Sequence, residues 1–133
     1  MSCERPAPGC LPRLGRSFQC ALAGCAQGLR GQRNLRIHLA FVVAITVLAL
    51  YLQVSLTQWA ILALTYSLVM AAELLNSALE ALTDLVSPKY HPLARQAKDL
   101  AAGAVLVTAI GAVAVGLLIL GPPLWAKITL WTH

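Results

Sequence analysis

Three long apolar stretches, separated by short polar connections, occupy most of this chain, at residues 37–54, 59–82 and 100–120. Each is close to the roughly 20 residues that a helix needs to cross the hydrocarbon core of a membrane. The pattern therefore predicts three transmembrane helices in an all-α fold. Gly121, Pro122 and Pro123 predict the end of the third helix and a short tail over residues 122–133.

The segment before the first span has apolar and polar positions on opposite sides of one helix. Projected at 100° per residue, its apolar side chains fall within an arc of about 80°, opposite arginines and glutamines. Residues 13–30 are therefore predicted to form an amphipathic helix in the cytoplasmic lipid interface. A solvated helix packed on other protein is the alternative. Gly24 and Gly28 weaken this helix but allow another backbone to approach closely, and residues 1–12, rich in proline, are predicted to be a disordered leader.

The basic residues predict the orientation of the chain. Six arginines precede the first span, three more cations lie between the second and third spans, and residues 53–58 carry no charge. The positive-inside bias then places the N-terminus and the second connection in the cytoplasm, and the C-terminus outside.

Composition excludes two classes of protein. Hydrophobic residues make up 59% of the chain, charged residues 11%, and the mean hydropathy is +0.73, whereas soluble domains carry about 25% charge. A soluble enzyme is excluded. The net charge of +5 could suggest a nucleic-acid partner, but only 6% of residues are aromatic and no basic run is interleaved with stacking rings, so no nucleic acid is expected.

The four cysteines all lie within the first 25 residues, and none forms a CxxC pair. The sequence has no signal peptide, so an oxidising compartment is not expected. We predict reduced thiols; a zinc or redox role is the less favoured alternative, because metal sites usually need tighter paired spacing.

The candidate chemistry is concentrated on the second apolar stretch. Glu73, Asn76, Glu80 and Asp84 fall within an arc of about 80° on one helix face. Ionisable groups at membrane depth are costly, so they face protein or water and indicate a functional site. The alternative is that Asn76 and a protonated Glu73 only hold helices together, but that role does not require three acids on one face.

Depth suggests different roles for these acids. Counted from Trp59 at 1.5 Å per residue, Glu73 lies about 21 Å and Glu80 about 32 Å inward, in a core of about 30 Å. The inner carboxylate is suited to accept a hydroxyl proton from a lipid, and the outer one to hold Mg²⁺. In the following connection, residues 87–98, cations are placed to contact phosphates, and Lys98 and Asp99 are expected to open the third helix, where free amides favour an anion.

Three segments resemble the signature of the prokaryotic diacylglycerol kinases and undecaprenol kinases: AELLNSALEALTDL (72–85), YHPLA (90–94) and AKDLAAGAV (97–105). The likeness covers roughly residues 13–121, which are predicted to form one membrane lipid kinase domain. The resemblance implies a multi-pass protein of the bacterial inner (plasma) membrane, assembled as a homotrimeric bundle with active sites between protomers. The implied reaction transfers the γ-phosphoryl group of ATP, with Mg²⁺, to a lipid hydroxyl.

The resemblance also implies roles for individual residues. Glu73 corresponds to the catalytic base, Asn76 to a site-organising position and Glu80 to a metal ligand that also serves the nucleotide. The other candidate nucleotide contacts are Arg13, Arg16, Lys89, Tyr90, His91, Lys98 and Asp99. One position departs from the family pattern: Gln32 stands where a glutamate commonly provides a second metal ligand.

A membrane lipid kinase is thus the leading interpretation, with undecaprenol or diacylglycerol as acceptor, since both present a primary hydroxyl on an apolar tail. Two alternatives stay open. A small oligomeric cation channel would explain Glu73 and Glu80 in the membrane, but not the chemistry around Lys98 and Asp99. A catalytically lapsed membrane adaptor is motivated only by Gln32.

Overall fold

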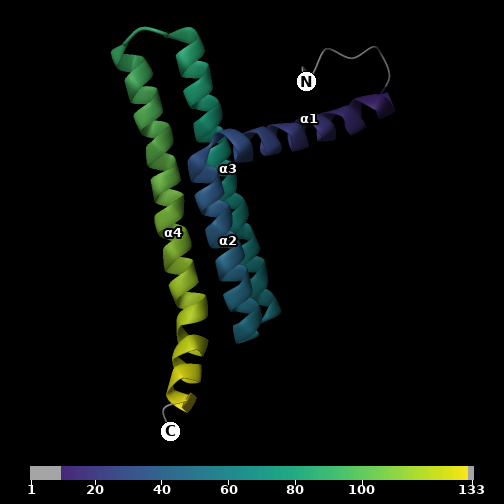
Figure 1. The fold of residues 1–133 in the computed structure, drawn as a ribbon, viewed down its shortest axis with the longest axis vertical. Coiled ribbons are helices and arrows are strands. Elements are labelled where there is room, and N and C mark those ends of the chain that lie inside the picture. The colour runs from purple at the N-terminus through teal and green to yellow at the C-terminus, as the bar shows by residue number, and fades with distance from the viewer. Residues whose placement is uncertain (1–9, 132–133) are drawn as a thin grey trace.

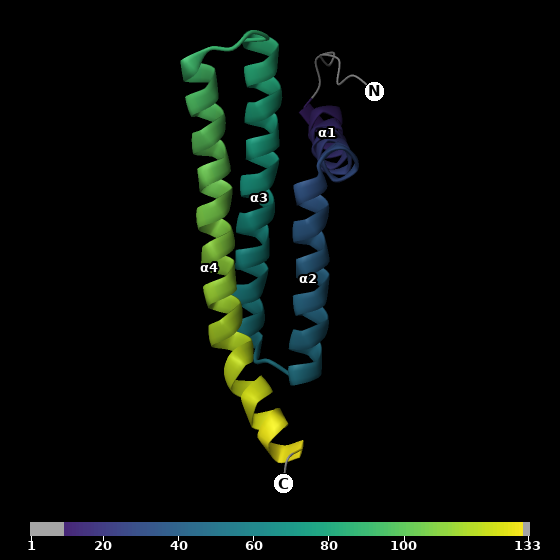
Figure 2. The same ribbon diagram turned by 60° about the vertical axis from the view of Figure 1, so that its left-hand side comes forward.

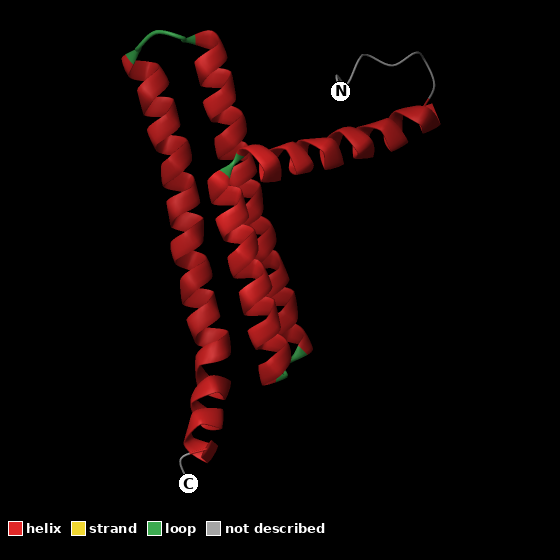
Figure 3. Cartoon of the chain, in the orientation of Figure 1, coloured by secondary structure: helices red, strands yellow, loops and turns green. Residues whose placement is uncertain are grey.

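In the computed structural model, which describes residues 10–131 and the side chains of 14–130, the chain forms helices joined by short loops (Figures 1 and 3). The helices are α1 (Cys10–Gly31), α2 (Arg33–Leu52), α3 (Leu56–Val86) and α4 (Pro92–Trp131). The all-α class is therefore confirmed. Helices α2, α3 and α4 are each long and apolar enough to cross a membrane, as the three apolar stretches predicted.

Local hydrogen bonds explain where α2 ends and where α3 begins. Ser55 begins α3 with a capping box: its hydroxyl accepts from the Gln58 N–H, while the Gln58 side-chain oxygen accepts from the Ser55 N–H. At the end of α2, Gln53 adopts a left-handed conformation (φ 54°), and the Val54 N–H donates to the Ala49 carbonyl. The expected extension of the first span to Val54 is therefore wrong, and the second span begins earlier than predicted.

Helix α4 does not end where the prolines predicted. It continues through Pro122 and Pro123 to Trp131, so the expected tail is helical up to residue 131. Proline removes one hydrogen bond but has a backbone angle that a helix accepts. Contacts hold the following turns in place: Leu124 packs on the core, and the Lys127 ammonium donates to the Tyr51 carbonyl at 2.8 Å and lies 3.9 Å from the Tyr51 ring centroid. Figure 2 shows this end of α4 bending toward the end of α2.

Helix α1 lies across the axis of the other three helices (Figures 1 and 2). It begins at Cys10, so residues 10–12 of the expected leader are helical, and the rest of that leader lies outside the described residues. Gly28 allows close packing, although against a side chain and not a backbone: a Cβ there would lie 2.9 Å from the Leu74 side chain on α3. Gly24 has open space around it, so the same expectation is wrong for that glycine.

The cysteine prediction is only partly correct. Cys25 is a free, exposed thiol, but Cys20 is disulfide-bonded. Sequence spacing does not define which thiols meet in space, because a disulfide depends on the distance and direction of the two Cβ atoms.

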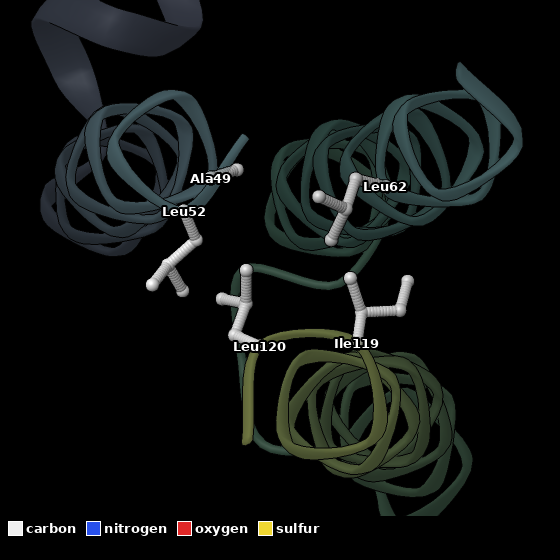
Figure 4. Close-up of a cluster of buried hydrophobic side chains, with 5 residues drawn as sticks. All are labelled: Ala49, Leu52, Leu62, Ile119 and Leu120. Carbon is white, nitrogen blue, oxygen red and sulfur yellow. The ribbon is translucent and has the colours of Figure 1, made fainter. Parts of the chain in front are cut away.

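The best-packed region lies where the ends of α2 and α4 meet the start of α3. Its buried side chains, drawn in Figure 4, are Ala49, Leu52, Leu62, Ile119 and Leu120. Elsewhere many large apolar side chains on α2, α3 and α4 are exposed, as expected for helices covered by lipid or by other chains. The polar face of α3 lies away from this core, toward the loop at residues 87–91, where α3 and α4 project past α1 (Figures 1 and 2).

Candidate active site on α3

Two polar side chains are buried within the described part of the chain, and both lie on the predicted face of α3. Glu73 is 2% exposed and Asn76 is 6% exposed. They are three residues apart, which puts them on adjacent turns of the same face. The sequence pattern therefore correctly indicated which helix face carries the unusual polar groups.

Asn76 links this buried pair to the next acid along the face. Its amide nitrogen donates to Glu80 Oε1 at 3.2 Å. In the described chain, however, Glu73 Oε2 and Asn76 Oδ1 are buried without a hydrogen-bond partner. An unpaired buried polar group costs about 1–3 kcal/mol, and a charged one more. Two such oxygens on one face are therefore acceptors still available to a substrate or to a neighbouring chain.

Helix α1 crosses α3 beside this face. A groove of about 560 Å³ is lined by α1, by Gln32 and by the α3 residues Leu74, Ser77, Ala78 and Ala81. This is the stretch of α3 that carries Asn76 and Glu80, so the polar face and α1 lie at the same level of the bundle. At 100° per residue, the groove is centred about a quarter turn away from the polar face.

Gln32 occupies the break between α1 and α2. Its backbone is extended (φ −106°, ψ 118°), its N–H donates to the Gly28 carbonyl at 2.8 Å, and its side chain makes no capping hydrogen bond to α2. It lines the groove with Ser77 and Ala81, which lie three residues before and one residue after Glu80 in α3. Gln32 therefore lines the groove beside the polar face of α3, and it does not contribute to that face itself.

Further along the face, Asp84 of α3 forms an ion pair with Lys98 of α4 at 2.5 Å. On α4 itself, Arg95 and Asp99 form a weaker pair at 3.5 Å. Both residues predicted to contact the nucleotide from α4 therefore have a charged partner within the chain. The sequence pattern placed Asp84 on the polar face of this helix but did not predict its ion pair with Lys98.

The expectation that Lys98 and Asp99 open the third helix is wrong, because α4 begins at Pro92. Proline suits the first turn of a helix, and His91 Nδ1 accepts a hydrogen bond from the Leu93 N–H at 3.2 Å. The free amides of this helix end therefore lie about two turns before Lys98. His91 caps the helix through one ring nitrogen.

The other predicted contacts are not brought to Glu73 within one chain. Lys89 and Tyr90 are exposed in the short loop after α3, about 20 Å along the helix axis from Glu73 at 1.5 Å per residue. Arg16 is exposed on α1, and the side chain of Arg13 lies outside the described ones. A site that used all of these residues would need contributions from more than one chain or a long ligand.

The residues fit a Mg²⁺ ion only as a partial ligand set. Among the described residues, no group of three or more His, Cys, Asp and Glu side chains is arranged to hold a metal. Mg²⁺ in kinases is commonly held by one or two carboxylates together with substrate phosphates and water. Glu80, held by Asn76, offers one such carboxylate, which fits an ion that arrives with a nucleotide.

Together these features define a helical membrane protein with three candidate spans and with a carboxylate and amide site beside a crossing helix. Comparison with known proteins identifies its family: the chain belongs to the prokaryotic diacylglycerol kinases, which it matches over residues 19–120. It is thus a member of a family of membrane lipid kinases, as predicted from the sequence.

The relatives are named after two different lipid acceptors, diacylglycerol and undecaprenol. The chain is 51% identical to a diacylglycerol kinase of Synechocystis over 85% of its own length, and spans 65% of that relative. It is 40% identical to an undecaprenol kinase of Bacillus subtilis, with 86% of this chain and 93% of the relative covered. A diacylglycerol kinase of Escherichia coli is 37% identical over 69% of this chain and 67% of the relative.

Proposed function

We propose that this protein transfers the γ-phosphoryl group of ATP to the primary hydroxyl of a membrane lipid, either diacylglycerol or undecaprenol. The observation that carries this proposal is the buried Glu73 carboxylate, whose Oε2 has no hydrogen-bond partner in the described chain. A lipid hydroxyl is a donor that would satisfy this acceptor. The family and the names of its members support the same reaction.

In the proposed reaction, Glu73 takes the proton of the lipid hydroxyl as that oxygen bonds to the γ-phosphorus. The bond from the γ-phosphorus to the bridging oxygen breaks, and ADP leaves. Phosphoryl transfer depends mainly on positioning and electrostatic stabilisation. Asn76 orients Glu80 by its 3.2 Å hydrogen bond, and the Lys98 ammonium offsets negative charge on the phosphates.

Glu80 is the residue that would hold Mg²⁺, and Gln32 is the candidate second ligand. When bound, the ion neutralises charge on the transferred phosphate. The remaining nucleotide contacts proposed are Asp99 on α4, then Lys89, Tyr90 and His91 in the loop before it, and finally Arg13 and Arg16 on α1.

The proposed level of the site in the membrane is argued from α1. Its exposed apolar side chains Leu14, Phe18 and Leu22 suit a helix lying in the cytoplasmic lipid interface. Because α1 crosses α3 between Leu74 and Ala81, this placement would put the carboxylate face at the level of the lipid headgroups. The ends of α3 and α4 would then project into water, where a nucleotide is available.

Assembly as a homotrimer in the bacterial inner membrane completes the proposal. An apolar crevice of about 450 Å³ between α2, α3 and α4 leaves room for side chains of a neighbouring chain or for a lipid tail. Ala112 and Gly116 line it, and such small residues allow helices to pack closely in membranes. Cross-linking of the purified protein in lipid nanodiscs should give a trimer band.

The decisive experiment supplies the purified protein with labelled ATP and one lipid at a time in vesicles. Phosphorylated lipid is expected, and the better acceptor identifies the branch of the family. Cation flux across the vesicle membrane without ATP turnover would instead support the channel. Absence of both activities would support the lapsed adaptor.

The orientation is tested by cysteine labelling in a variant whose native cysteines are replaced by serine. A cysteine at Pro88, in the loop after α3, is expected to react with an impermeant maleimide only from the cytoplasmic side. A cysteine at Thr57, in the first turn of α3, is the matched control and should react only from outside. A reporter fused after His133 should also be outside. Labelling of position 88 from outside would overturn the orientation.

The effect of Gln32 on the metal requirement is a further prediction. A glutamine oxygen can ligate Mg²⁺ but lacks the charge that offsets a hard dication. Gln32→Glu is therefore expected to lower the Mg²⁺ concentration for half-maximal rate about tenfold, equivalent to about 1.4 kcal/mol. Lipid selectivity should change little.

Gln27→Glu is the matched control, because Gln27 lines the same groove from α1. It should leave the Mg²⁺ titration unchanged. Identical titrations for Gln32→Glu and the unmodified protein would place Gln32 outside the metal shell. An inactive natural protein with activity restored by Gln32→Glu would favour the lapsed enzyme.

A further inference from the structure

The ion pair between Asp84 and Lys98 is the one charged contact that joins α3 to α4 in the described chain. The residues are 14 positions apart and belong to different helices, so the pair depends on the packing of the hairpin. The Lys98 side chain is 36% exposed and that of Asp84 is 69% exposed. The proposed reaction has so far given Asp84 no role.

Asp84 lies on the same face of α3 as Glu80, one turn further toward the loop. At 1.5 Å per residue, this separation is about 6 Å along the helix axis. The Asp84 carboxylate, which pairs with the Lys98 ammonium, therefore lies on the turn of α3 next to the one that carries Glu80. Glu80 itself is held by Asn76 and makes no ion pair with Lys98 in the described chain.

We propose that Asp84 is a positioning residue, which holds the Lys98 ammonium beside Glu80 so that it is ready to bind the phosphates of ATP. This inference rests on the proposed kinase function. An ammonium group has three N–H donors, and Asp84 occupies one of them. Two remain for phosphate oxygens, so the pair need not break when the nucleotide binds.

The physical gain is a side chain that is ordered in advance. Lysine has a flexible four-carbon stem, and fixing it on binding a ligand costs rotamer entropy. A carboxylate from the neighbouring helix lowers this cost and also keeps the ammonium from settling on Glu80, the carboxylate proposed for the metal. Since the pair is solvent-exposed, its effect on ATP affinity should be modest, about three- to fivefold.

The test combines four variants of the full-length protein in lipid nanodiscs: Asp84→Asn, Asp84→Glu, Lys98→Met and the double variant Asp84→Asn with Lys98→Met. Initial rates at saturating lipid give kcat and the KM for ATP, and calorimetric titration with the non-hydrolysable analogue AMP-PNP gives a Kd. Thermal unfolding midpoints show whether the hairpin is weakened. Lys127→Met is a matched control, because it removes an internally paired lysine at the opposite end of the bundle.

Asp84→Asn is expected to raise the KM for ATP and the Kd for AMP-PNP about three- to fivefold, with kcat within about twofold of the natural protein. Asp84→Glu should restore most of the affinity, and in the Lys98→Met background Asp84→Asn should change nothing further. Lys127→Met should not alter the Kd.

Two results would overturn the role of Asp84: an unchanged Kd in Asp84→Asn, or the same rise in Kd without Lys98. If the unchanged Kd came with a lower unfolding midpoint, the pair would be a structural brace. The AMP-PNP titrations also separate this inference from the proposed function. Absence of lipid phosphorylation by the natural protein would refute the kinase reaction, while the four Kd values would still decide whether Asp84 acts through Lys98.

Discussion

Glu73→Gln is expected to slow phosphoryl transfer by about 10² to 10⁴, the usual contribution of a general base, while the protein remains folded and binds ATP. The carboxylate is buried at 2% exposure, and its Oε2 has no partner in the described chain. Glutamine keeps the size and a hydrogen-bonding carbonyl but cannot take the hydroxyl proton. The loss should therefore appear in kcat and not in the KM for ATP.

Initial rates with radiolabelled ATP at saturating lipid measure this effect. Ser77→Ala is the matched control: it removes the hydrogen bond from the Ser77 hydroxyl to the Glu73 backbone carbonyl, at 2.9 Å, but leaves the carboxylate in place. Its kcat should be within a few-fold of the natural value. A near-normal kcat in Glu73→Gln would remove Glu73 from the reaction and favour a role in holding helices together.

Much of the fold was predictable, because a helix that crosses a membrane must have mostly apolar side chains. Helices that cross lipid need about 20 apolar residues, and the three apolar stretches correctly gave α2, α3 and α4. Their ends were less predictable. Pro122 and Pro123 predicted a stop from local preference alone, whereas Leu124 and Lys127 hold the chain helical beyond them through contacts with residues far away in sequence.

In the site too, features fixed within one helix were predictable, whereas contacts between helices were not. Helical periodicity places Glu73, Asn76 and Glu80 on one face, since their spacing is fixed within α3. The pairing of Lys98 with Asp84 depends on the packing of α3 against α4, so periodicity could not reveal it. Placing Gln32 in a groove beside Ser77 likewise required the angle at which α1 crosses α3.

Asn76→Leu is expected to lower kcat about 10- to 100-fold, because a hydrogen bond to a charged group is worth about 1.5–3 kcal/mol. The amide of Asn76 donates to Glu80 Oε1 at 3.2 Å and is the contact that orients this carboxylate. Leucine fills a similar volume but offers no donor. Glu80 would then be free to adopt other rotamers, and less of the protein would hold it in the geometry suited to Mg²⁺.

The competing role for Asn76, a polar link between helices, predicts a different pair of measurements. If that role were the main one, Asn76→Leu would lower the thermal unfolding midpoint and leave kcat nearly unchanged. The structure favours the opposite outcome, because Asn76 Oδ1 has no partner in the described chain and leucine removes this unsatisfied acceptor from a buried position. In a Glu80→Gln background the further loss from Asn76→Leu should be small, since Asn76 acts through the Glu80 carboxylate; an undiminished loss there would mean that Asn76 contacts the substrate directly.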